Sequence, residues 1–218
     1  MSVIMPVCAW PDPGDDGGAP HPFLLRSLES AMTSVTPSAL QLVVLVDGNA
    51  MRVHDAVARW LDDTHVEYVL RCCERRPGTW GNRQRNHALD HQLATRSLIA
   101  WQDQDDAFFP GALTHVLDEA RAHPGQPLIF RMQVCADRFG SLPFVLWRER
   151  GRVERNHIGG HMLVAPNVPR LLGRWEPETS YSADFDFIDS TLKKFAADGI
   201  HPHWSEHFIS NLRPDAMR

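Results

Sequence analysis

The sequence of 218 residues has few cysteines, no excess of positive charge and no long apolar run. Its four cysteines include no C-x-x-C pair, which argues against a zinc site or a disulfide framework. The formal net charge of −5 argues against general nucleic-acid binding, which needs a positive surface. No apolar run is long enough for a membrane span, and the N-terminus lacks the basic flank of a signal peptide. We therefore expect a cytoplasmic protein with no transmembrane segment.

The first half of the chain shows apolar runs that alternate with amphipathic segments. Because strands and helices alternate in this way, we expect an α/β fold with a mostly parallel central sheet and helices on both faces. Ligands of such sheets bind outside the C-terminal ends of the strands. The expected strands are residues 3–8, 41–46, 66–71 and 98–100, and the expected helices are residues 24–31, 53–61, 82–93 and 110–120.

The second half predicts shorter strands and one more helix. The strands are expected at residues 128–130, 144–147 and 159–165, and the helix runs from Ser182 to a glycine cap at Gly199. No element is predicted after residue 200. Without internal repeats or a linker, we expect one domain over residues 1–218, with a nucleotide-binding half at 1–110 and an acceptor-binding half at 111–218.

Acidic residues follow two of the predicted strands. Asp47 ends the second strand, and Asp103, Asp105 and Asp106 follow the fourth. In an extended chain, residues two apart point the same way, so Asp103 and Asp105 are expected to face one point and Asp106 another. Close carboxylates repel one another unless a cation lies between them, and Mg²⁺ or Mn²⁺ suits such ligands. The alternative is a solvated acidic turn.

Six segments in order resemble the family-2 nucleotide-sugar glycosyltransferases, which have the GT-A fold. The chain departs from the family pattern at Val46 and Ala183, where the family has acidic residues, and near Ala9, where it has asparagine. The matching segments are the opening strand at 2–7, the first helix at 23–30, the D-G turn at 43–48, the G-x-x-x-R-N helix start at 81–86, the D-x-D-D motif at 103–106 and the E-D segment at 183–186.

The resemblance implies a metal-dependent enzyme that moves a sugar from a nucleotide-sugar donor, expected to be a UDP-sugar, to an acceptor hydroxyl of unknown identity. It implies that Mn²⁺ or Mg²⁺ is bound by Asp103, Asp105 and a C-terminal histidine, for which His207 is the candidate and His203 the alternative. The implied nucleotide-sugar-binding residues are Pro6, Asp47, Arg85 and Asp103, with Asp47 accepting a hydrogen bond from the base.

The resemblance also implies Asp184 as the general base of an inverting reaction, with Asp186 as the alternative. Two other functions stay open. A sugar-nucleotide nucleotidyltransferase would need basic residues directly after the first strand, yet no lysine or arginine precedes Arg26. A non-catalytic nucleotide-binding module is favoured by Ala183 and disfavoured by the intact D-x-D-D motif.

Overall fold

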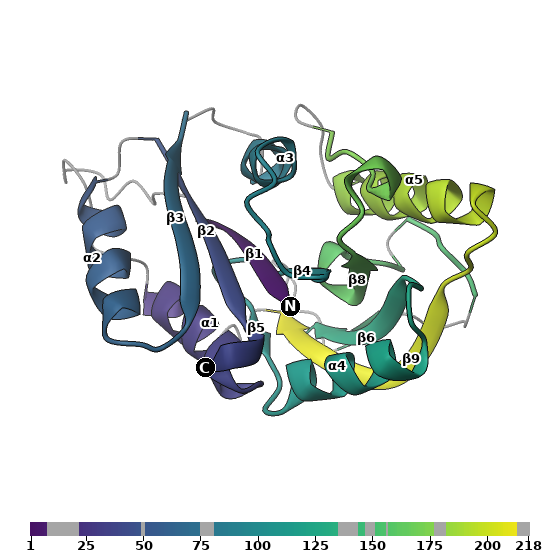
Figure 1. Cartoon of the computed structure of the whole chain (residues 1–218), viewed down its shortest axis with the longest axis horizontal. Coiled ribbons are helices and arrows are strands. Elements are labelled where there is room, and N and C mark those ends of the chain that lie inside the picture. Colours follow the sequence, from purple (N-terminus) through teal and green to yellow (C-terminus); the bar gives the residue numbers. More distant parts are fainter. Residues whose placement is uncertain are drawn as a thin grey trace.

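The computed structural model describes residues 1–7, 22–48, 51–74, 81–134, 144–146, 151–155, 157–176 and 182–212. Within these residues the chain forms a curled sheet with helices on both of its faces (Figure 1). The acidic Gly/Pro loop expected at residues 11–22, whose role the sequence leaves open, lies outside the described residues except for Pro22.

The first half of the sheet is parallel, as expected. Its strands are β1 (Ser2–Val7), β2 (Gln41–Asp47), β3 (Glu67–Cys73) and β4 (Leu98–Trp101), in the order β3-β2-β1-β4. β1 and β2 are buried along their whole length, which explains why they have continuous apolar runs instead of alternating ones. The parallel pairing places the C-terminal ends of β2 and β4 on the same edge of the sheet.

The two faces of this sheet have separate cores. Val3, Met5 and Val44 point into a core that includes side chains of α1, α2 and α4, whereas Ile4 and Val43 point into a core with side chains of α3 and α5. The helices therefore cover both faces (Figure 1). None of the helices in the described part of the chain is long and apolar enough to cross a membrane. The helices are α1 (Pro22–Thr33), α2 (Met51–Asp62), α3 (Asn82–Asp90), α4 (Ala112–Ala122) and α5 (Ala183–Ala197).

The second half of the sheet mixes parallel and antiparallel pairs. β8 (Leu163–Pro166) pairs antiparallel with β4 and so joins the two halves. The sheet continues through β6 (Leu128–Val134), β9 (His203–Leu212) and β5 (Ala107–Phe108), while β7 (Phe144–Leu146) pairs with β6. Short 3₁₀ turns lie at Pro37–Ala39, Gly160–Met162 and Pro169–Leu171.

The strand β9 was not predicted. It comes from the C-terminal segment, which is rich in histidine and polar residues, and it lies between β6 and β5. Its register with β6 shifts twice between Ile129 and Met132, so burial along β9 does not alternate regularly. A strand with such irregularities lacks the period of two by which sequence analysis detects strands.

Candidate functional site

The candidate site begins where β4 leaves the sheet. The backbone N–H of Gln102 still donates to the carbonyl of Ile4 at 3.1 Å, which continues the pairing by one residue. The Gln102 side chain is buried and its amide donates to the Ser27 carbonyl at 3.1 Å and to the Asp106 carbonyl at 3.2 Å. These bonds hold the acidic segment 103–106 against α1.

The acidic segment turns and does not stay extended. The backbone N–H of Asp106 donates to the Asp103 carbonyl at 3.2 Å. The expectation that Asp103 and Asp105 face one point assumed an extended chain, and that assumption is wrong. In a turn, a different pair of side chains lies together. The carboxylates that converge are those of Asp103 and Asp106, which lie 3.4 and 3.3 Å from His161 Nε2.

Asp103, Asp106 and His161 form a group whose ligand atoms lie within 4.8 Å of one another. Asp105 does not belong to this group, and its backbone carbonyl accepts a hydrogen bond from Arg26 at 3.2 Å. Asp106 and His161 are buried, whereas the Asp103 side chain is 40% exposed, so the group opens to solvent on one side. The two carboxylates suit Mg²⁺ or Mn²⁺, and the imidazole nitrogen favours Mn²⁺.

The charges in this group stabilise one another. Burial alone would lower the pKa of His161, but the carboxylates of Asp106, Asp103 and Asp184 outweigh burial and raise it to about 9. Burial would likewise raise the pKa of Asp103, but Arg85 and His161 hold it well below its usual range. At neutral pH the positive charge of the protonated His161 lies between the two carboxylates, and His161 must lose that proton before its nitrogen can bind a metal ion.

Arg85 is the second cation of the site and is only 3% exposed. Its guanidinium forms an ion pair with Asp103, donates to Asn82 at 3.1 Å and lies 4.5 Å from the centre of the Trp175 ring. The helix α3 positions Arg85 in the site. Gly81, at the start of α3, adopts φ +79°, a backbone conformation that favours glycine. A Cβ on Gly81 would lie 2.7 Å from the side chain of Pro6, so the absence of a side chain lets α3 approach β1.

Asp184 borders the same group from α5. Its carboxylate accepts the backbone N–H of Gly160 at 3.0 Å, and it contributes to the raised pKa of His161. Asp186, the alternative base, points elsewhere, since it pairs with Arg155 at 3.4 Å. The structure therefore brings Asp184, and not Asp186, to the group of Asp103, Asp106 and His161.

Gly160 is held between Asp184 and a packed ring. A Cβ at this position would lie 2.7 Å from the Trp175 ring and 3.2 Å from Asp184 Oδ1. The Trp175 ring cannot move away easily, because it stacks on Phe187 at 4.4 Å and contacts Trp101 at 5.5 Å. Gly160→Ala should therefore lower the free energy of unfolding by about 1–3 kcal/mol, measured by urea denaturation.

The Trp175→Phe background is the control for this prediction. Phenylalanine lacks the outer ring atom that the new Cβ would meet. The loss caused by Gly160→Ala should therefore be smaller in that background, as a double-mutant cycle would measure. An equal loss in both backgrounds would show that the clash with Trp175 is not the cause.

Asp47 lies on the same sheet edge, two strands from β4. It is buried at the end of β2 opposite Cys73, and its carboxylate contributes, after burial and Cys72, to a rise in the Cys73 pKa to about 11. Its strand partner Cys73 lines an open cavity of about 290 Å³ between β3 and α3. The cavity is lined by Cys73, Glu74, Arg83, Asn86, His87 and Asp90.

The structure does not bring His207 to the Asp103 group. His207 lies on β9 and stacks on His115 of α4 with a centroid distance of 4.8 Å. The sequence could not show this, because the segment that carries His207 was not recognised as a strand. The histidine in the group is His161, which the sequence analysis did not name as a ligand.

No protein-family model matches the chain, and no curated protein matches its sequence. Solved structures share its fold. The crystal structure of S. aureus TarS matches 97% of this chain and 36% of its own, with a TM-score of 0.72 and 14% identity. S. aureus TarS 1-349 in complex with UDP and in complex with UDP-GlcNAc each match 96% of this chain, with TM-scores of 0.70 and 16% identity.

The matched structures are longer than this chain, which covers 59% of TarS 1-349 with UDP and 57% of the UDP-GlcNAc complex. Since the sequence identities are low, the likeness is one of fold. The predicted GT-A type α/β fold is thereby confirmed.

Proposed function

We propose that the chain is a metal-dependent glycosyltransferase that moves a sugar from a nucleotide-sugar donor, most simply a UDP-sugar, to an acceptor hydroxyl. The observation that carries the proposal is the convergence of Asp103, Asp106 and His161 beside Arg85, at the C-terminal edge of the parallel sheet. This is the edge at which open α/β sheets bind ligands. The TarS structures that share the fold include complexes with UDP and UDP-GlcNAc.

In this proposal the first half of the chain, residues 1–110, binds the donor. Asp47 accepts a hydrogen bond from the base in the region of the cavity between β3 and α3, while Pro6 and Arg85 lie nearer the diphosphate. Arg85 is already paired with Asp103, so it can share its charge with a phosphate oxygen at short range.

The divalent ion of the proposal is Mn²⁺ or Mg²⁺. Asp103, Asp106 and His161 would hold it, a set that replaces the expected set of Asp103, Asp105 and His207. A bound ion would neutralise the negative charge that develops on the nucleoside diphosphate as it leaves. Asp105 lies outside this set, and its backbone carbonyl accepts a hydrogen bond from Arg26.

The second half, residues 111–218, supplies the base and the acceptor side. Asp184 borders the metal group from α5, and its bond to the Gly160 N–H fixes the orientation of the carboxylate. In the proposed reaction Asp184 takes the proton of the acceptor hydroxyl as that oxygen attacks the anomeric carbon. A single displacement of this kind inverts the configuration at that carbon.

Thermal denaturation with a panel of nucleoside diphosphates, with and without Mn²⁺, tests the donor site. A ligand at about 100 times its Kd should stabilise the protein by about 2.7 kcal/mol. We expect one nucleotide, UDP, to raise the Tm in the presence of Mn²⁺, and Asp106→Asn to abolish the metal-dependent part. Asp105→Ala, which lies outside the metal group, should retain it.

No rise in Tm with any nucleotide would contradict the proposed donor site. Loss of the Mn²⁺ effect in Asp105→Ala but not in Asp106→Asn would restore the ligand set expected from the sequence. Nucleotide binding without release of UDP from UDP-sugars would favour the second candidate, a non-catalytic nucleotide-binding module. That candidate is favoured by Ala183, which stands where the family has an acidic residue.

A further inference from the structure

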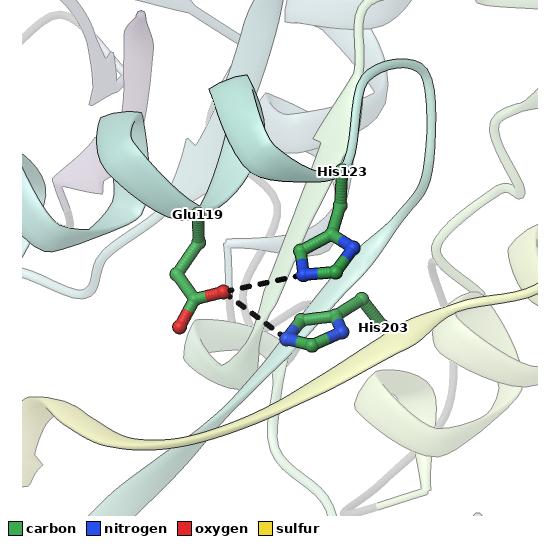
Figure 2. A group of neighbouring side chains, drawn as sticks. All are labelled: Glu119, His123 and His203. Carbon is green, nitrogen blue, oxygen red and sulfur yellow. Dashed lines mark ion pairs between the residues drawn. The ribbon is translucent and has the colours of Figure 1, made fainter.

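A second group of titratable side chains lies away from the candidate donor site, where α4 meets β9. Glu119 lies in the last turns of α4, His123 follows the helix directly, and His203 begins β9. Figure 2 shows both imidazole rings pointing at the Glu119 carboxylate. His123 and His203 are 80 residues apart in the sequence, and the pairing of β9 with β6 brings them together.

The ligand atoms of this group have the spacing of a metal site. His203 Nε2 lies 3.1 Å and His123 Nε2 lies 3.8 Å from the same oxygen, Glu119 Oε2. All three ligand atoms lie within 4.8 Å of one another. In a tetrahedral zinc site with bonds of about 2.0–2.1 Å, neighbouring ligand atoms are about 3.3 Å apart. Small side-chain rotations would therefore bring the three atoms to bonding distance of one ion.

We propose that Glu119, His123 and His203 form a zinc-binding site that joins α4 to β9. Two imidazole nitrogens and one carboxylate oxygen are a donor set that binds Zn²⁺, and imidazole nitrogens favour zinc over Mg²⁺. None of the three residues belongs to the group of Asp103, Asp106 and His161. The proposal is therefore independent of the proposed glycosyltransferase activity.

The neighbours of Glu119 orient its carboxylate and partly shield the site from solvent. The Ser205 hydroxyl donates to Glu119 Oε1 at 3.0 Å, so one carboxylate oxygen is held while the other faces the two imidazoles. A hydrogen bond from the surroundings to a ligating side chain fixes its orientation. The side chains of Glu119, His203 and His123 are 21%, 20% and 33% exposed, so the site is partly shielded yet open to an entering ion. His207 Nε2 faces the other oxygen, Oε1, at 3.9 Å, so water would fill the fourth position of the ion.

Zinc binding requires one local change. The rings of His123 and His203 are stacked, with a centroid distance of 3.6 Å and an angle of 15° between their planes. A metal ion lies in the plane of each imidazole that binds it, so the two rings must tilt apart. His123 directly follows α4, and His203 is the first residue of β9. The ion would then tie the C-terminal end of α4 to β9, which pairs with both β6 and β5.

Titration of the full chain with Zn²⁺ alone, by calorimetry and by Tm, tests this site. We expect the wild type to bind Zn²⁺ with a rise in Tm. His203→Gln and Glu119→Gln should each weaken the affinity at least tenfold and remove most of the rise. The matched control is His201→Gln, an exposed histidine two residues before His203 and outside the group, which should bind as the wild type does. Substitution by Co²⁺ should give the strong visible absorption of a tetrahedral complex, and His203→Gln should lose it.

The variant His161→Gln separates this site from the candidate donor site. Because His161 lies in the other group, Zn²⁺ affinity at the α4–β9 site should be unchanged in that variant. No Zn²⁺ binding by the wild type, or equal binding by His203→Gln, would overturn the proposal. Zn²⁺ binding that is lost in His161→Gln and kept in His203→Gln would assign the ion to the donor site and would also overturn it.

Discussion

Replacing Asp184 by asparagine should lower kcat by about 10²–10⁴-fold, the usual contribution of a general base. Asparagine has nearly the same shape and keeps an oxygen that can accept the hydrogen bond from the Gly160 N–H, which is 3.0 Å long in the wild-type protein. What it loses is the ability to take a proton. The measurement is release of UDP from the donor that the nucleotide panel identifies, with water or an added acceptor as the nucleophile. Binding of UDP should be unchanged, because Asp184 is proposed to act on the acceptor.

Asp186→Asn is the matched control for this prediction. It makes the same chemical change two residues along α5, at a side chain that is 39% exposed and pairs with Arg155. Its kcat should stay close to that of the wild type. An unchanged kcat in Asp184→Asn would contradict the assignment of the base, and a loss confined to Asp186→Asn would move the assignment to that residue.

Replacing Asp103 by alanine should lower the free energy of unfolding by about 3 kcal/mol, at the lower end of the range for breaking a buried ion pair. The reason is that Arg85, which is 3% exposed, would lose the carboxylate that it pairs with. Asn82 and the Trp175 ring would remain as partners of the guanidinium, and Asp103 itself is 40% exposed, so a larger loss is not expected. Urea denaturation in the presence of EDTA measures the effect without a bound ion.

A double-mutant cycle with Arg85→Met identifies the cause. If the loss comes from the unpaired guanidinium, the double variant should be more stable than the sum of the two single losses predicts, by about 0.5–3 kcal/mol. Asp90→Ala is the control, because it breaks a pair with Arg174 in which both side chains are more than half exposed. Its effect should be no more than about 1 kcal/mol. Additive losses in the cycle would contradict a buried ion pair between Arg85 and Asp103.

The fold of the first half could be predicted because the sequence patterns that encode its strands and helices are local. Strands buried on both faces, such as β1 and β2, require continuous apolar runs, and helices require apolar residues at a period of 3.6. The order of these elements predicts parallel pairing, which in turn places Asp47 and Asp103 on one edge. β9 could not be predicted in this way, because its register shifts and its polar residues remove the alternation on which recognition depends.

The candidate site could be predicted only in part. Asp103 and Asp184 were expected, and the structure brings both to His161. Asp106 and His161 were not expected as metal ligands, because a turn at residues 103–106 and a contact across the sheet bring them together. His207 was expected there and lies instead against α4. The group of Glu119, His123 and His203 was not foreseen for the same reason, since its members lie on two elements far apart in the chain.

By itself, the sequence determined the α/β fold and the sheet edge that carries the acidic residues. These follow from periodicity and from the order of the elements, which neighbouring residues encode. The tertiary structure alone decided which carboxylates and which histidines lie together. Such groups depend on turns, registers and packing between distant segments, where a shift of a few ångströms decides whether three side chains can hold one ion.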